Sequence, residues 1–182
     1  AGRDLSTLRS VASFFVSRVD TEVDARLAKI DSPQAAALAG TAAIANARIA
    51  YRRYEAVCRG ERWTALAATG AHPQRPLWAS TSTKNPAYDD TRYVTQLVGS
   101  GVVNTMPEPT LNAVLDHGEI RPDSVRHGDP DPQAVLDALQ DVGVNYDDVV
   151  QTLEDEGLAK FIDSWTALEG RVQTRLKLGH GA

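Results

Sequence analysis

The sequence has little of what several classes of protein require. It contains one cysteine, Cys58, which excludes a disulfide framework and favours a reducing compartment such as the cytoplasm. It has no apolar run of roughly 18 residues, so it predicts no membrane-spanning segment. No block of basic residues stands out from a net charge of −5, which argues against nucleic acid or an anionic membrane as the main partner. Neither an HxxxH nor a CxxC pattern occurs, and we therefore expect no metal.

Methionine is almost absent as well. Met106 is the only one, and the sequence begins with Ala1. Removal of an initiator methionine would explain this start, but a chain cut or trimmed from a longer polypeptide explains it equally. The 182 residues are 42% hydrophobic and 24% charged, a composition that excludes wholesale disorder and suits a folded domain.

What the sequence does contain is an alternation of short β-like runs and helical stretches. A run of apolar, β-branched and aromatic residues predicts a strand at 11–19, and two further short runs predict strands at 75–80 and 102–106. Helical spacing and capping residues predict helices at 20–27, 33–58, 90–98, 107–117, 132–139, 147–154 and 157–178. Strands separated by helices pair in parallel, so the predicted class is α/β. Three strands are too few for a complete doubly wound sheet or an eight-stranded barrel.

Hydroxyl, amide and cationic side chains gather where the predicted strands end. In α/β folds ligands bind at the carboxyl ends of the parallel strands. Arginine supplies planar paired donors, lysine a point charge and hydroxyls neutral donors, a combination that suits phosphate. The candidates at the first two strand ends are Ser13, Phe15, Ser17, Arg18, Ser80, Lys84 and Asn85.

Each candidate also has a structural interpretation. Arg18 could pair with Asp20, the only nearby carboxylate, and Ser13 could be a small core residue. Lys84 could be a solvated loop residue, and the hydroxyls of 81–86 could bond their own backbone. A lysine can also form a Schiff base with a carbonyl substrate, a role that we rank second for Lys84.

Three long segments carry a resemblance to a known family. VASFFVSRVDTEVDARL, RPLWASTSTKNPAYDDTRYV and VNTMPEPTLNAVLDHG closely resemble transaldolases of the longer bacterial subtype, and LEDEGLAKFIDSWTALE resembles that family's last helix. The resemblance implies a (β/α)8 barrel without metal or cofactor. It also implies a reaction that moves a dihydroxyacetone unit from sedoheptulose 7-phosphate to glyceraldehyde 3-phosphate, giving erythrose 4-phosphate and fructose 6-phosphate. A fourth-strand lysine forms the Schiff base in that family.

The resemblance assigns this chain to the barrel from the sixth strand onward. Residues 1–118 match the last three βα units, and 119–182 match a loop and C-terminal helices that pack on the barrel. Ser13 and Arg18 match sugar-phosphate ligands, and Phe15 matches an aromatic residue of the pocket. Ser80 matches the seventh strand, where Lys84 stands near the place of a second phosphate-binding arginine.

The reactive lysine has no counterpart in this chain and is expected upstream of Ala1. The resemblance therefore implies that the isolated chain is inactive and that its partner is the N-terminal half of the barrel. Two alternatives remain open: a stand-alone class I aldolase that uses Lys84, and an inactive fragment with a scaffold or binding role.

Overall fold

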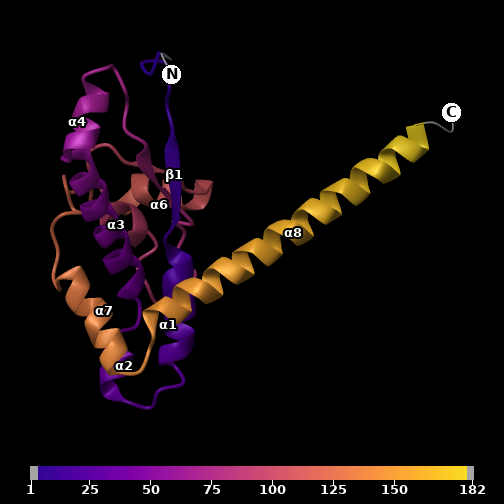
Figure 1. Cartoon of the computed structure of the whole chain (residues 1–182). Coiled ribbons are helices and arrows are strands. Elements are labelled where there is room, and N and C mark those ends of the chain that lie inside the picture. The colour runs from indigo at the N-terminus through magenta and orange to yellow at the C-terminus, as the bar shows by residue number, and fades with distance from the viewer. Residues whose placement is uncertain (1–3, 180–182) are drawn as a thin grey trace. The chain divides into compact units, whose positions relative to one another are not determined.

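The computed structural model describes residues 4–179, and its chain divides after Asn145 into two units (Figure 1). The first unit contains, in chain order, β1 (Val11–Phe15), α1 (Ser17–Leu27), α2 (Pro33–Ala37), α3 (Ala42–Cys58), α4 (Glu61–Ala67), β2 (Arg75–Ala79), α5 (Arg92–Thr95), β3 (Val103–Asn104), α6 (Glu108–His117) and α7 (Pro132–Asp141). The second unit is a single helix, α8 (Tyr146–Gly179). None of the helices in the described range is long and apolar enough to cross a membrane.

The strands form one parallel sheet in the order β1-β2-β3, as the sequence predicts. Phe15 pairs in register with Ala79 at the end of the first ladder, and Trp78 pairs with Asn104 in the second. The carboxyl ends of all three strands therefore lie at one edge of the sheet. β1 and β3 are the outer strands, so each has an edge that no other described strand covers.

Helix α3 covers one face of the sheet and packs against α1, α4 and α7. Trp78 is fully buried on this face, where its ring meets that of Phe14 edge-on at 5.7 Å between centroids. Its indole N–H donates to the carbonyl of Leu97 at 3.0 Å, which satisfies the one polar atom of the ring. Successive strand residues point to opposite faces, so Ser13 and Phe15 belong to the other face.

The predicted first strand was too long, because residues 17–19 belong to α1. The ladder ends where the amides of Val16 and Ser17 donate to the carbonyls of Ala79 and Ser80, both at 2.9 Å. From there the buried positions follow the helical period: Val16, Val19, Val23 and Leu27. A β-branched run can satisfy either period over a few residues, and packing on α3 selects the helix.

The single alanine-rich helix predicted over 33–58 was also wrong, since residues 38–41 interrupt it. Gly40, within this interruption, has a φ of +71°, a conformation that other residues adopt at a cost. The predicted start is confirmed, because the hydroxyl of Ser32 accepts from the amide of Ala35 at 3.1 Å, with Pro33 in the first turn.

The other helices differ mostly in extent. The predicted helix 90–98 is reduced to α5, and α4 was not predicted. The two predicted C-terminal helices form one, because Gly157 weakens a helix interior without providing a stop. α6 ends at Gly118 as expected, and α7 extends two residues past the predicted Leu139.

Candidate functional site

The carboxyl ends of β1 and β2 are joined by two serines. The hydroxyls of Ser17 and Ser80 lie 2.8 Å apart, and the amide of Ser17 donates to the carbonyl of Ser80 at 2.9 Å. Ser80 has a φ of +55°, an unfavourable conformation for a residue with a side chain, and such strain is concentrated at functional sites. Two hydroxyl groups are thus fixed side by side at the edge where α/β proteins bind ligands.

Phe15 and Arg18 form a second pair at the end of β1. The guanidinium of Arg18 lies over the Phe15 ring, 4.2 Å from its centroid, and both side chains are exposed. Stacking on an aromatic ring leaves the in-plane N–H donors of an arginine available to an oxyanion. Ser13 is also exposed, which is against the interpretation of this serine as a core residue.

The expected alternative pairing of Arg18 with Asp20 is not observed. Asp20 is buried, with 2% of its surface exposed. One of its oxygens accepts from the Tyr93 hydroxyl at 2.6 Å, and the other accepts from the Ala43 amide at 2.7 Å. Burial raises the pKa of Asp20, while both hydrogen bonds act to lower it.

Lys84 and Asn85 line a cavity of about 230 Å³ beside the paired serines. Its other walls come from α1, from the loop that follows β2 and from α5, through Ser17, Asp20, Thr21, Asp24, Tyr88 and Tyr93. The Lys84 ammonium is exposed and donates to the Ser82 hydroxyl at 2.8 Å. A Schiff-base lysine is activated by burial or by a nearby cation, so this exposure argues against Lys84 as a nucleophile.

Two carboxylates one turn apart on α1 hold the loop that carries Lys84. Asp24 accepts from the Tyr88 hydroxyl at 2.7 Å and from the Gly40 amide at 2.8 Å. This arrangement repeats that of Asp20 with Tyr93 and Ala43, and burial together with Asp24 raises the pKa of Tyr88 to about 12. Both phenols are therefore neutral donors at neutral pH. Tyr88 connects α1 to the loop between β2 and α5, and Tyr93 connects α1 to α5 itself.

The predicted candidates are thus brought together in part. Lys84 and Asn85 share a cavity, Ser80 bonds to Ser17, which lines it, and Phe15 pairs with Arg18. Their binding of phosphate stays a prediction. Ser17, which the sequence analysis also placed at the end of the first strand, lines this cavity. Sequence reasoning overlooked Tyr88 and Tyr93 as site residues, and the available signal was the recurrence of Asp20 and Asp24 at helical spacing.

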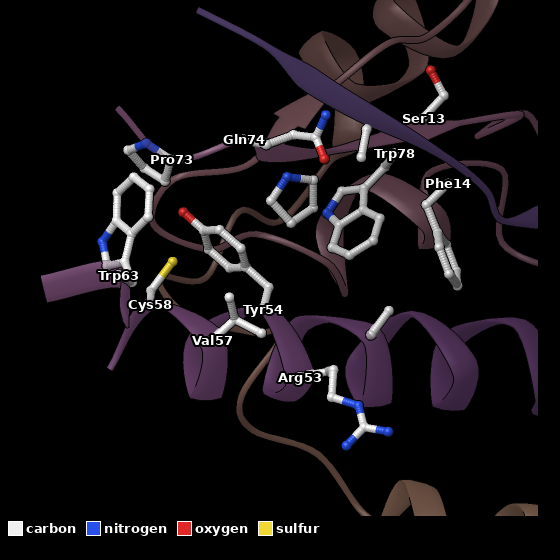
Figure 2. Close-up of a pocket in the computed structure, with 13 residues that line it drawn as sticks. Ser13, Phe14, Arg53, Tyr54, Val57, Cys58, Trp63, Pro73, Gln74 and Trp78 are labelled. Atoms are coloured by element: carbon white, nitrogen blue, oxygen red, sulfur yellow. The ribbon is translucent and has the colours of Figure 1, made fainter. Parts of the chain in front are cut away.

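A larger cavity, of about 440 Å³, lies on the other side of β1 between the sheet and helices α3 and α4 (Figure 2). Figure 2 shows Tyr54 and Trp78 directed into it, whereas Ser13 on β1 points away from α3. Its wall is mostly apolar and includes Phe14, Tyr54, Val57, Trp63 and Trp78. Val57 keeps 61% of its surface exposed, so this side of the molecule presents apolar surface next to the uncovered edge of β1.

These features define an α/β protein with a small parallel sheet whose strand ends carry hydroxyl and cationic side chains. The sequence matches the family Transaldolase/Fructose-6-phosphate aldolase over residues 3–172, and the chain belongs to that family. It is 61% identical over 176 residues to a transaldolase of Thermobifida fusca, covering 97% of this chain and 48% of that protein. It is 58% identical over 182 residues to transaldolase 1 of Streptomyces avermitilis, covering 100% of this chain and 48% of the relative.

The chain spans about half the length of the curated relatives it matches. A small parallel sheet flanked by helices is consistent with part of a (β/α)8 barrel, which has eight strands when complete. The α/β class and the resemblance to transaldolases are thereby confirmed.

Proposed function

We propose that this chain is the sugar-phosphate-binding, C-terminal half of a cytoplasmic transaldolase of the pentose phosphate pathway. The observation that carries the proposal is the arrangement of side chains at the strand ends. Arg18 stacks on Phe15, the hydroxyls of Ser17 and Ser80 pair, and Lys84 lines the cavity of about 230 Å³ that Ser17 also lines. Cations and neutral donors at neighbouring strand ends can neutralise and orient a phosphate.

The reaction class comes from the family. The transaldolase reaction transfers a dihydroxyacetone unit between sugar phosphates through a lysine Schiff base. The reactive lysine belongs, in this proposal, to the half of the relatives that this chain does not cover. The role of the present residues is to bind the phosphate, so that remote binding energy positions the reacting carbons at that lysine.

The remainder of the barrel is the proposed partner. The free edges of β1 and β3 leave backbone N–H and C=O groups available to further strands. The apolar cavity beside β1 and the exposed Leu115 of α6, with 75% of its surface uncovered, would be buried by the helices of neighbouring βα units. An inactive scaffold fragment is the alternative if those surfaces accept no complementary half.

Reconstitution tests the proposal. The chain is mixed with the N-terminal half of the Thermobifida fusca transaldolase, and transfer from fructose 6-phosphate to erythrose 4-phosphate is measured. We expect activity in the mixture and none from either half. Activity of the isolated chain, or a borohydride-trapped adduct on its Lys84, would instead support a stand-alone aldolase.

Arg18→Gln then tests the phosphate role in the reconstituted enzyme. Loss of a charge-assisted contact should lower kcat/KM for a phosphorylated acceptor by about 10- to 100-fold and leave an unphosphorylated acceptor nearly unchanged. Arg26→Gln is the matched control, because Arg26 lies two turns further along α1 and pairs with Glu22 at 2.8 Å. Equal losses with both acceptors would contradict the assigned role.

A further inference from the structure

A separate cavity of about 200 Å³ lies between the start of α3, α5 and the loop that precedes α7. Two arginines line it, Arg48 from α3 and Arg92 from α5. The other polar lining residues are Thr41, Gln96 and Asp129. A buried water occupies about 30 Å³ of liquid volume, so the cavity has room for a tetrahedral oxyanion.

Arg48 is a buried cation with no anionic partner among the residues that the structure describes. Only 9% of its surface is exposed, its Nε has no hydrogen-bond partner, and one terminal nitrogen donates to the Ser124 carbonyl at 3.4 Å. Burial lowers the pKa of Arg48, and the neighbouring Arg52 lowers it further, whereas Arg52 itself pairs with Asp131 at 3.0 Å. A buried charge that lacks a counter-charge is costly, so an anion beside Arg48 would be stabilising.

Arg92 repeats part of this pattern: it is half-buried, and the carboxylates of Asp20 and Asp89 lie near enough to interact with its charge. Its Nε is buried and has no hydrogen-bond partner, and one terminal nitrogen donates to the Gly40 carbonyl. Its guanidinium lies 4.7 Å from the centre of the Tyr88 ring and 5.3 Å from that of Tyr93. The group is therefore fixed in orientation while part of its donor capacity is unused.

Glycines stand directly against both guanidinium groups. A Cβ at Gly128 would overlap the guanidinium of Arg48, and a Cβ at Gly40 would lie 2.9 Å from a terminal nitrogen of Arg92. Both glycines also have positive φ. The absence of a side chain at these two glycines therefore leaves room for the two guanidinium groups, as expected of a preformed binding site.

We propose that this cavity binds a phosphate group through Arg48 and Arg92. The cavity lies at the start of α3, a helix of 17 residues whose N-terminal end carries partial positive charge. Thr41 does not cap that helix with its side chain, and Asp20 accepts from one of the first amides, that of Ala43. The only acidic residue in the lining is the exposed Asp129. Bound phosphate would connect α3, α5 and the loop before α7, so it would stabilise this side of the fold.

The test is a titration of the 182-residue chain with inorganic phosphate at constant ionic strength, followed by thermal unfolding. We expect Tm to rise with the logarithm of the phosphate concentration above Kd, by about 3 °C at ten times Kd. In Arg48→Met, which keeps an apolar stem of similar length, the Kd should rise at least tenfold. The Tm without phosphate should not fall, because a buried charge is removed. Arg92→Met and Arg48→Lys provide further variants, and both should weaken phosphate binding.

Arg52→Met is the matched control, since it removes an arginine one helical turn away and should leave the phosphate response intact. Fructose 6-phosphate distinguishes a free phosphate from the phosphoryl group of a sugar. A Tm response to inorganic phosphate that is lost in Arg48→Met and kept in Arg18→Met supports phosphate binding in the cavity. For fructose 6-phosphate, the part of the response that depends on Arg48 belongs to the cavity, and the part that depends on Arg18 belongs to the proposed strand-end site. A response kept in Arg48→Met and lost in Arg18→Met assigns the binding to the strand ends and overturns this proposal, as does no response to inorganic phosphate.

Discussion

Removal of one buried hydroxyl tests the network that holds the strand-end loop. Tyr93 is almost fully buried and donates to Asp20 at 2.6 Å. Tyr93→Phe keeps the ring and leaves one carboxylate oxygen without its donor. A buried hydrogen bond to a charged group contributes about 1.5–3 kcal/mol, so we expect a loss of about 2–3 kcal/mol in the free energy of unfolding at pH 7, measured by urea denaturation.

The same variant has a predicted pH dependence. Burial raises the pKa of Asp20 above 3.8, so the native state takes up its proton at a higher pH than the unfolded chain does. This group therefore lowers stability as pH rises from below 3.8 through the raised pKa. Loss of the Tyr93 hydroxyl raises that pKa further, because the hydrogen bond favours the carboxylate. The difference in the free energy of unfolding between wild type and Tyr93→Phe should be greatest near pH 7 and should become smaller toward about pH 3.

The matched control is Tyr88→Phe, which removes the equivalent hydroxyl from Asp24 at a half-buried position. Its expected cost is about 0.5–1 kcal/mol, since water can replace the lost donor. A cost for Tyr93→Phe that is no larger than this, or that is the same at both pH values, would refute the reasoning.

Other variants test the helix break and an exposed ion pair. Gly40→Ala should destabilise the chain by at least about 1–2 kcal/mol in urea denaturation, because φ is +71° and a Cβ would lie 2.6 Å from the Tyr88 ring. Gly157→Ala is its control and should stabilise α8 by up to about 1 kcal/mol, because a Cβ there meets nothing within 4 Å; a loss there would contradict the helix assignment. Hydrogen bonds to Asp90 and Asp116 raise the pKa of His117 above 6.5, so its stabilising contribution is present below pH 6.5 and declines as pH rises through the raised pKa. NMR titration of Asp90→Asn should show a lower His117 pKa than wild type, and an unchanged value would exclude this pairing.

Local chemistry alone located much of the fold. β2 was predicted from a short run that contains Leu77 and Trp78, α2 from Ser32 and Pro33, and the end of α6 from Gly118. These features depend on a few adjacent residues, and their physical causes are capping, proline geometry and strand propensity. The same applies to Lys84 and Asn85, whose place just after a strand follows from chain order.

Tertiary packing determined the features that adjacent residues alone do not specify, among them where α1 begins and which residue pairs with Asp20. Val16–Val19 satisfies both a strand and a helix pattern, and contact with α3 made it helical from Ser17. Pairing of Arg18 with Asp20 was one of two interpretations that the sequence left open, but Asp20 is buried and accepts from Tyr93, which is 73 residues away. The sequence by itself determined an α/β chain with donors at its strand ends. Only the tertiary structure decided which donors share a cavity, since burial and distant partners set their charge and direction.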